Sequence, residues 1–136
     1  MRRSCRAQVT SLLNVAAVSM ACMVISGCTA TMVPADLLKK IQEKNSPVII
    51  DVRSRGEYEH GHLPGAVHIP FYSVGSGLGE LKLEKNRQIV LYCEHGPRAG
   101  LAGLSLYLHG YDQLFSLDGH MQGWRANGLP VEKTSP

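Results

Sequence analysis

The stretch IVLYCEHGPRAG, from Ile89 to Gly100, joins an apolar run to a helix-like segment through a short loop that carries a cysteine and an arginine. Residues Ile89 to Tyr92 have the continuous apolar character of a strand buried on both faces. The segment Arg98 to His109 is apolar nearly all round, which predicts a helix packed on two sides and capped by Gly110. A buried strand followed at once by a helix is the repeating unit of a parallel sheet.

The same alternation recurs along the rest of the chain. We predict further strands at Val48–Val52, Ala66–Ile69 and Leu114–Leu117, and further helices at Pro34–Asn45 and Met121–Asn127. The glycine-rich segment Ser73 to Gly79 lacks the spacing of a phosphate-binding loop, and we predict a flexible connector into a turn of helix around Leu81. The predicted fold class is α/β, with a central, mostly parallel sheet of four or five strands and helices on both faces.

The first 27 residues are typical of a secretory signal. Three arginines precede the apolar run Val9 to Ile25, which is shorter than the ~20 residues a membrane-spanning helix needs. The motif VISGC, Val24 to Cys28, resembles a bacterial lipobox, in which the cysteine is lipidated and becomes the mature N-terminus. An uncleaved anchor helix and a plain signal peptide are the alternatives.

The lipobox resemblance implies three parts: a lipoprotein signal peptide over residues 1–27, a lipidated tether over 28–33, and a domain over 34–134. It also implies a lipid anchor on Cys28 and a periplasm-facing protein of a bacterial cell envelope. Thr29 stands where aspartate would favour inner-membrane retention, so the expected location is the outer membrane. Without Arg2, Arg3 and Arg6 the 14 basic residues fall to 11, which equals the 11 acidic residues, so the charge gives no reason to expect nucleic acid as a partner.

The cysteines then fall into two groups. Cys5 and Cys22 would leave with the signal segment and Cys28 would be blocked by lipid, so Cys93 is the one free thiol expected in the mature chain. That excludes a disulfide within the mature chain. A lone thiol in an oxidising compartment is either buried for structural reasons or chemically used.

The loop from Cys93 to Arg98, which we name the cysteine loop, favours chemical use. Its cysteine ends a strand of a parallel sheet, where ligand sites gather, and faces the positive end of the following helix. Both predict a lowered cysteine pKa. Arg98 offers a planar fork for an oxyanion, Gly96 the freedom for a tight turn, and Pro97 a suitable helix start.

The cysteine loop resembles the active-site loop of rhodanese domains, which are sulfurtransferases. A second signature agrees: YEHGHLPGAVHI, Tyr58 to Ile69, is similar to the Tyr-x3-His-Leu-Pro-Gly-Ala-x2-Ile pattern of that family. The stretches DVRSRGEY from Asp51 and GWRANGLPVE from Gly123 also resemble the family. The resemblance covers about Val33 to Lys133. It fails at LDGH, Leu117 to His120, where the family commonly has two glycines.

This resemblance implies that Cys93 takes the outer sulfur of a small donor such as thiosulfate and holds it as a persulfide. The persulfide then passes to cyanide or to a thiol, with a protein sulfur acceptor as a further partner. No cofactor and no metal are expected. The implied substrate-binding residues are those of the cysteine loop, Glu94, His95, Gly96, Pro97 and Arg98.

Three alternatives stay open at this point. Cysteine-dependent phosphatases and arsenate reductases use Cys-x5-Arg, a wider ring than the Cys-x4-Arg found here. A carrier or protein-binding module would hold sulfur without turnover of its own.

Two residues of the cysteine loop leave questions open. Glu94 at the rim is expected to weaken the attraction for a dianion such as thiosulfate, which leaves the physiological donor open. His95 either tunes the cysteine or faces solvent.

Residues outside the loop are expected to support it without touching the sulfur. Asp51 ends a buried strand and is expected to pair with a backbone group or an arginine, and Arg53 is expected to form an ion pair with Glu57, four residues on. His62 is expected to hydrogen-bond within its own loop, since it, His60 and His68 lack the spacing of metal ligands. Trp124 is expected to anchor the last helix in the core.

Overall fold

The computed structural model describes residues 30–43 and 46–134, and this part forms a five-stranded sheet in which every neighbouring pair is parallel. The spatial order is β1-β5-β4-β2-β3. The strands are β1 (Ala30–Met32), β2 (Val48–Asp51), β3 (Val67–His68), β4 (Ile89–Tyr92) and β5 (Leu114–Leu117). The predicted fold class is therefore confirmed, with five strands and no antiparallel pair within the sheet.

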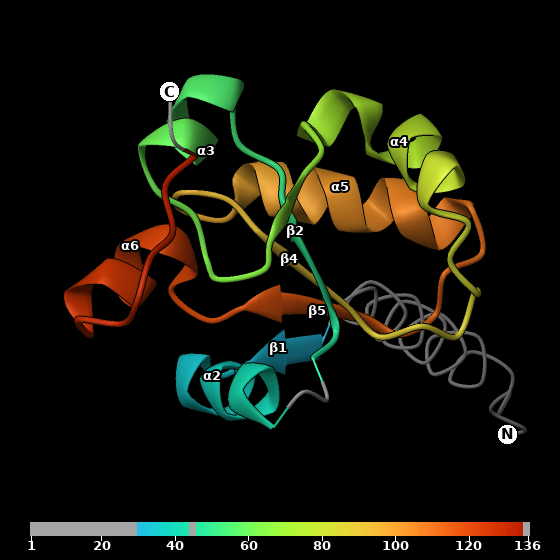
Figure 1. Cartoon of the computed structure of the whole chain (residues 1–136). Coiled ribbons are helices and arrows are strands. Elements are labelled where there is room, and N and C mark those ends of the chain that lie inside the picture. The colour runs from blue at the N-terminus through green and yellow to red at the C-terminus, as the bar shows by residue number, and fades with distance from the viewer. Residues whose placement is uncertain (1–29, 44–45, 135–136) are drawn as a thin grey trace, which may run out of the picture.

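Helices cover both faces of this sheet (Figure 1). They are α2 (Pro34–Gln42), α3 (Arg55–His60), α4 (Val74–Leu81), α5 (Pro97–Leu108) and α6 (His120–Ala126). Helices α4 and α5 lie on one face, while α2 and α6 pack against the other. A short 3-10 turn at Phe71–Ser73 leads into α4.

Strand β4 feeds both layers of the core because successive side chains of a strand point to opposite faces. Ile89, Leu91 and Cys93 enter the layer shared with α4 and α5. Val90 and Tyr92 enter the layer that contains Leu37 of α2 and the fully buried Trp124 of α6. Burial on both faces of the sheet therefore explains the continuous apolar run of β4, as predicted. Trp124 anchors α6 in the core, also as predicted.

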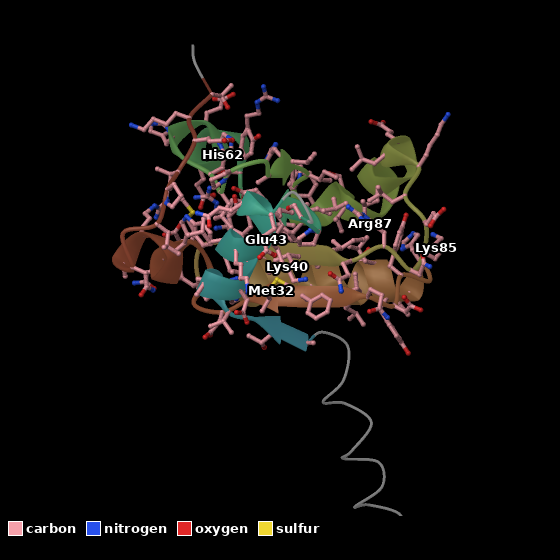
Figure 2. The ribbon with its side chains drawn as sticks, turned by 60° about the horizontal axis from the view of Figure 1, so that its bottom comes forward. Met32, Lys40, Glu43, His62, Lys85 and Arg87 are labelled. Atoms are coloured by element: carbon pink, nitrogen blue, oxygen red, sulfur yellow. The ribbon has the colours of Figure 1, made fainter. Side chains whose placement is uncertain are left out.

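The segment predicted as a tether is partly a strand. Ala30 to Met32 pairs in parallel with Phe115 to Leu117, so β1 forms the edge of the sheet. Met32 is buried and lies against the α2 layer, where Figure 2 labels it. Ala30 to Met32, which fall within the segment predicted as a tether, therefore belong to the sheet, while Cys28 lies outside the described residues.

The predicted connector at Ser73 to Gly79 was also wrong, because it forms most of helix α4. Val74 and Leu78, four residues apart, are both buried in the core and supply the apolar face. Gly77 is there for space: a β-carbon would lie 2.7 Å from Ile69 Cγ2. The glycines that suggested a linker instead let this helix pack closely against Ile69, the residue that follows β3.

Helix α5 differs from its prediction on one side. Its inner face is buried through Ala99, Ala102 and Leu106, but Leu101, Leu104, Tyr107 and Leu108 are exposed. The helix is therefore packed on one face only. Helix α3 was not predicted at all; it begins with a capping box in which Ser54 and Glu57 exchange hydrogen bonds.

Because all strands run in the same direction, the sheet has one end formed by the amino ends of the strands and another formed by their carboxyl ends. The cysteine loop follows the carboxyl end of β4, whereas β1 begins toward the amino end of the strands. Lys85 and Arg87, in the turn before β4, lie toward the end of the molecule far from His62 (Figure 2). In the part of the chain that the structure describes, no helix combines the length and apolar character needed to span a membrane.

Candidate active site

The cysteine loop turns sharply between β4 and α5. Gly96 has φ +124°, a conformation that side chains rarely adopt, and its N–H donates to Cys93 Sγ at 3.0 Å. Pro97 occupies the first turn of α5, and the Gly100 N–H donates back to the Gly96 carbonyl at 3.0 Å. The loop therefore brings a backbone donor onto the sulfur, as its sequence predicted.

The beginning of α6 fixes the other side of the cysteine loop. Met121 N–H donates to the Cys93 carbonyl at 3.0 Å, and Gln122 N–H donates to the Glu94 carbonyl at 3.4 Å. These two bonds attach the backbone of the cysteine loop to the first turn of α6. The residues of α6 that support the loop lie at least 27 positions after their partners in the loop.

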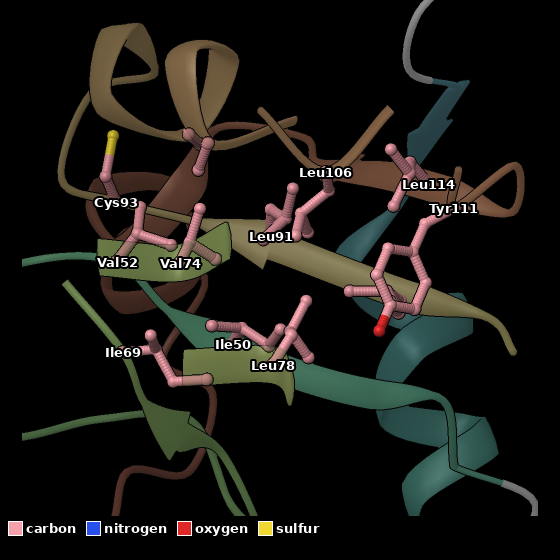
Figure 3. Packing of buried hydrophobic residues seen from close by; sticks show 13 residues of the cluster. Ile50, Val52, Ile69, Val74, Leu78, Leu91, Cys93, Leu106, Tyr111 and Leu114 are labelled. Atoms are coloured by element: carbon pink, nitrogen blue, oxygen red, sulfur yellow. The ribbon is translucent and has the colours of Figure 1, made fainter. Parts of the chain in front are cut away.

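Cys93 is almost completely covered, with 1% of its surface exposed. Its neighbours in the core include Ile50, Val52 and Val74. Figure 3 shows the sulfur directed away from Val52 and Val74 and toward the loop that leads into α5. The cysteine is thus buried, yet its sulfur accepts a hydrogen bond, which a purely structural apolar cysteine would not require.

Arg98 is held by a carboxylate on another element. Its Nη1 and Nη2 donate to Glu57 Oε2 and Oε1 of α3 at 2.8 and 2.9 Å, a bidentate pair. The hydrogen bonds from Arg98 hold the pKa of Glu57 well below its usual range, and the same bonds raise the pKa of Arg98. Glu57 therefore fixes the guanidinium of Arg98 to α3.

The predicted Arg53–Glu57 ion pair was wrong. Arg53 is fully buried and instead binds Asp51, with Nη2 to Oδ2 at 2.6 Å. Tyr92 OH also donates to Asp51 Oδ2, at 2.7 Å, and accepts the Leu63 N–H. Burial and then the charge of Asp51 raise the pKa of Tyr92, so its hydroxyl stays protonated. The expected pairing of Asp51 with an arginine is confirmed.

Glu94 is the point where this buried network meets the cysteine loop. Its carboxylate lies 3.3 Å from Arg53 Nη1 and 2.6 Å from Arg125 Nη1 of α6. Two arginines offset its charge, so the expected repulsion of an anionic donor is weaker than the sequence suggested. Glu94 ties β2, the loop and α6 together.

The two predicted histidines have different surroundings. His95 is in the loop, and its Nδ1 hydrogen-bonds to Gln122 Oε1 at 3.1 Å on the exposed side. His62 bonds Tyr58 O at 2.9 Å, stacks on the Tyr58 ring, and pairs through its backbone with Glu132. His62 thus joins the C-terminal segment to α3, as expected of a local hydrogen bond, and is not part of the loop's support.

His120 is the site residue that sequence reasoning missed. Its Nδ1 accepts the Cys93 N–H at 3.4 Å, and its ring lies against Gly96. The sequence did show that His120 replaces one of the two glycines expected at this turn. From that replacement alone the contact between His120 and Cys93 could not be predicted. Within residues 30–43 and 46–134, no three or more histidine, cysteine or acidic side chains are grouped to hold a metal ion.

Known proteins are similar to this chain in sequence and in fold. Thiosulfate sulfurtransferase GlpE of Pseudomonas savastanoi pv. phaseolicola is 28% identical over 94 residues, which cover 69% of this chain and 86% of that protein. The putative sulfur carrier protein YrkF of Bacillus subtilis is 33% identical over 86 residues, which cover 63% of this chain but only 45% of that protein. The crystal structure of the Alr3790 protein from Anabaena sp. superposes with a TM-score of 0.67 at 30% identity, covering 76% of this chain and 82% of that one.

The family match covers most of the described fold. A model described as the rhodanese-like domain matches residues 34–127, which include the cysteine loop, its α3 partner Glu57 and all but the first strand of the sheet. The chain therefore belongs to the rhodanese-like domain family.

Proposed function

We propose that this protein is a sulfurtransferase that carries a sulfane sulfur on Cys93. The observation that carries the proposal is the Gly96 N–H on Cys93 Sγ, in a Cys-x4-Arg loop whose arginine is fixed by Glu57. A backbone donor aimed at the sulfur stabilises negative charge there. Relatives named thiosulfate sulfurtransferase support the same reading.

The proposed reaction consists of two displacements. The Cys93 thiolate attacks the outer sulfur of thiosulfate, the S–S bond of the donor breaks, and sulfite leaves with the electron pair. Cyanide or a thiolate then attacks the outer sulfur of the persulfide, and Cys93 leaves as a thiolate. Splitting the transfer through a covalent intermediate replaces one difficult step by two easier ones.

The chain's own residues have separate roles in this scheme. Gly96 N–H binds the charged sulfur, and Arg98 supplies a positive charge beside it. Glu57 fixes the position of that charge, and Glu94, held by Arg53 and Arg125, fixes the loop. The narrow Cys-x4-Arg turn favours a single sulfur atom over the tetrahedral group that a phosphatase must hold.

A turnover assay tests the enzyme activity. Wild type should form thiocyanate from thiosulfate and cyanide, while Cys93→Ser should fall to the uncatalysed background because serine cannot form a persulfide. The melting temperature of Cys93→Ser is the control for folding. Thiocyanate formation at the wild-type rate by Cys93→Ser would contradict the mechanism, and hydrolysis of an aryl phosphate by wild type would favour the phosphatase alternative.

A second candidate is a sulfur carrier that receives and delivers sulfur only within a docked complex. The observation in its favour is the 1% exposure of Cys93, since a covered sulfur is shielded from small molecules. The likeness to the putative sulfur carrier YrkF points the same way. Rapid turnover with free thiosulfate and cyanide would exclude the carrier reading, whereas slow uptake that a protein donor accelerates would favour it.

The lipid anchor on Cys28 and the periplasm-facing, outer-membrane location are also proposals. The motif Val24 to Cys28 supports them. In the sequence Cys28 precedes β1 by two residues, and the amino end of β1 is directed away from the carboxyl end of β4, which carries the cysteine loop.

A further inference from the structure

His120 has an unusual backbone conformation at the start of α6. Its φ is +50°, directly after Gly119 at +66°. Among the non-glycine residues that the structure describes, only Lys82, at +48°, shares this left-handed conformation. A side chain there costs free energy relative to glycine, and such strain persists only where the surroundings hold it in place.

The surroundings of His120 are the cysteine loop itself. Cys93 N–H donates to Nδ1 at 3.4 Å. The other edge of the ring lies over Gly96, where Nε2 is 3.0 Å from the position that a β-carbon on Gly96 would take. The ring therefore touches both ends of the Cys93–Gly96 turn, whose Gly96 N–H binds the sulfur.

These contacts require one protonation state. Nδ1 accepts a hydrogen bond, so it carries a lone pair, and the proton of the neutral ring is on Nε2. Burial lowers the pKa of His120 below its ordinary value of 6.5, which keeps the ring neutral at neutral pH. The groups that face it are Asp118 in the β5–α6 turn, whose charge opposes this shift, and His95 and Cys93 in the loop.

We propose that His120 is a positioning residue for sulfur transfer, a neutral imidazole that holds the Cys93–Gly96 turn with the Gly96 N–H on the sulfur. The kinetic consequence rests on the proposed sulfurtransferase function, whereas the hydrogen bond itself does not. Glycine at this position would relieve the backbone strain but would leave the Cys93 N–H without its acceptor. Protonation in acid would turn Nδ1 into a donor facing another donor and would release the turn.

Three substitutions separate the parts of this proposal. His120→Gly removes both the strain and the acceptor. His120→Asn keeps an acceptor atom on a residue that tolerates the left-handed region, but it does not titrate. Lys82→Gly is the matched control, because it relieves the same backbone strain at an exposed helix end away from the cysteine loop.

Sulfur uptake from thiosulfate gives the kinetic readout. We expect His120→Gly to lower kcat about tenfold with little change in KM, since misplacing a reacting group weakens the transition state more than substrate binding. In wild type we expect protonation of His120 to lower the rate in acid, below the ordinary pKa of 6.5, and His120→Asn should keep most of the wild-type kcat and lose this part of the pH dependence. Lys82→Gly should match wild type in kcat and in pH profile.

The amide resonance of Cys93, followed by NMR in the resting protein, tests the contact without sulfur chemistry. It should shift with pH in step with the His120 ring in wild type and stay flat in His120→Asn. A Cys93 amide that ignores the titration of His120, or a His120→Gly variant with the kcat of Lys82→Gly, would overturn the proposal. If wild type takes up no sulfur while the amide still titrates, the sulfurtransferase function fails and the positioning contact is supported.

Discussion

At the scale of single residues, the pair Arg98–Glu57 decides where positive charge lies beside Cys93. Glu57 accepts bonds from Arg98 and, at the start of α3, from the Ser54 N–H and hydroxyl. One carboxylate thus caps a helix and fixes an arginine 41 residues away. The sequence predicted Glu57 to pair with Arg53 because four-residue spacing is a local signal, whereas the real partner is set by how α3 packs beside the cysteine loop.

Glu57→Gln tests this double role. We expect it to lower the free energy of unfolding by about 1 to 2 kcal/mol at neutral pH, the range for charged hydrogen bonds on a partly exposed pair. Sulfur uptake should slow several-fold because Arg98 loses its anchor. The pKa of Glu57 is lowered in the folded state, so its contribution is present above the ordinary value of 4.5 and is lost as the pH falls below it.

Wild type should therefore lose stability in acid more steeply than Glu57→Gln, as measured by urea denaturation across the acid range. Glu59→Gln is the matched control: Glu59 lies on the same helix in an exposed pair with Arg55. It should change the unfolding free energy by less than about 0.5 kcal/mol and leave sulfur uptake unaltered. Equal acid slopes for wild type and Glu57→Gln would contradict the assignment.

At the scale of helices and strands, the sequence predicted the elements with strong apolar periodicity. It missed those that depend on contacts with other parts of the chain. Strands β2, β4 and β5 and helices α2, α5 and α6 were predicted within a few residues because their own side chains form the core. Strand β1 carries little apolar signal, since its pairing with β5 and not its composition makes it a strand. Helix α4 was hidden by its three glycines, two of which, Gly75 and Gly77, leave room for His109 and Ile69 in the folded protein.

The glycines of α4 give a paired stability prediction. A β-carbon on Gly77 would lie 2.7 Å from Cγ2 of Ile69, a buried β-branched side chain that cannot rotate away, so Gly77→Ala should destabilise by about 1 to 3 kcal/mol. A β-carbon on Gly79 meets nothing within 4 Å, so Gly79→Ala should stabilise by about 0.5 to 1 kcal/mol through helix propensity. Thermal denaturation measures both, and a stabilising Gly77→Ala would contradict the close packing of α4 on Ile69.

The candidate site was predictable to the extent that it is local. Cys93, Gly96, Pro97 and Arg98 lie in one short loop, so their spacing alone predicted a nucleophile beside backbone donors and an arginine. The roles of Glu57, Glu94 and His120 depend on α3 and α6, which approach the loop only in three dimensions. The contacts of His120 were harder to predict. A histidine in place of glycine indicates an altered turn, but it does not show which atoms the histidine ring contacts.

At the scale of the whole molecule, the first described strand and the cysteine loop lie toward different ends of the parallel strands. Strand β1 begins level with Val90, near the amino end of β4, whereas Cys93 follows the carboxyl end of β4. The family match covers the domain from Pro34 onward and does not bear on the residues before it. The proposed lipid on Cys28 therefore needs its own test.

Metabolic labelling with palmitate provides that test. Wild type should be labelled and Cys28→Ala should not, because the lipobox cysteine is the proposed site of acylation. Cys22→Ala is the matched control, since it removes a cysteine of the predicted signal peptide and should leave labelling intact. Labelling of Cys28→Ala, or its loss in Cys22→Ala alone, would contradict the assignment.

The most direct measurement of the central claim is the intact mass of the purified protein before and after incubation with thiosulfate. Wild type should gain the mass of one sulfur atom, and cyanide should remove it. Cys93→Ser should gain nothing under the same conditions. A stable sulfur adduct on Cys93→Ser, or no adduct on wild type at saturating donor, would contradict a persulfide held on Cys93 by the Gly96 amide.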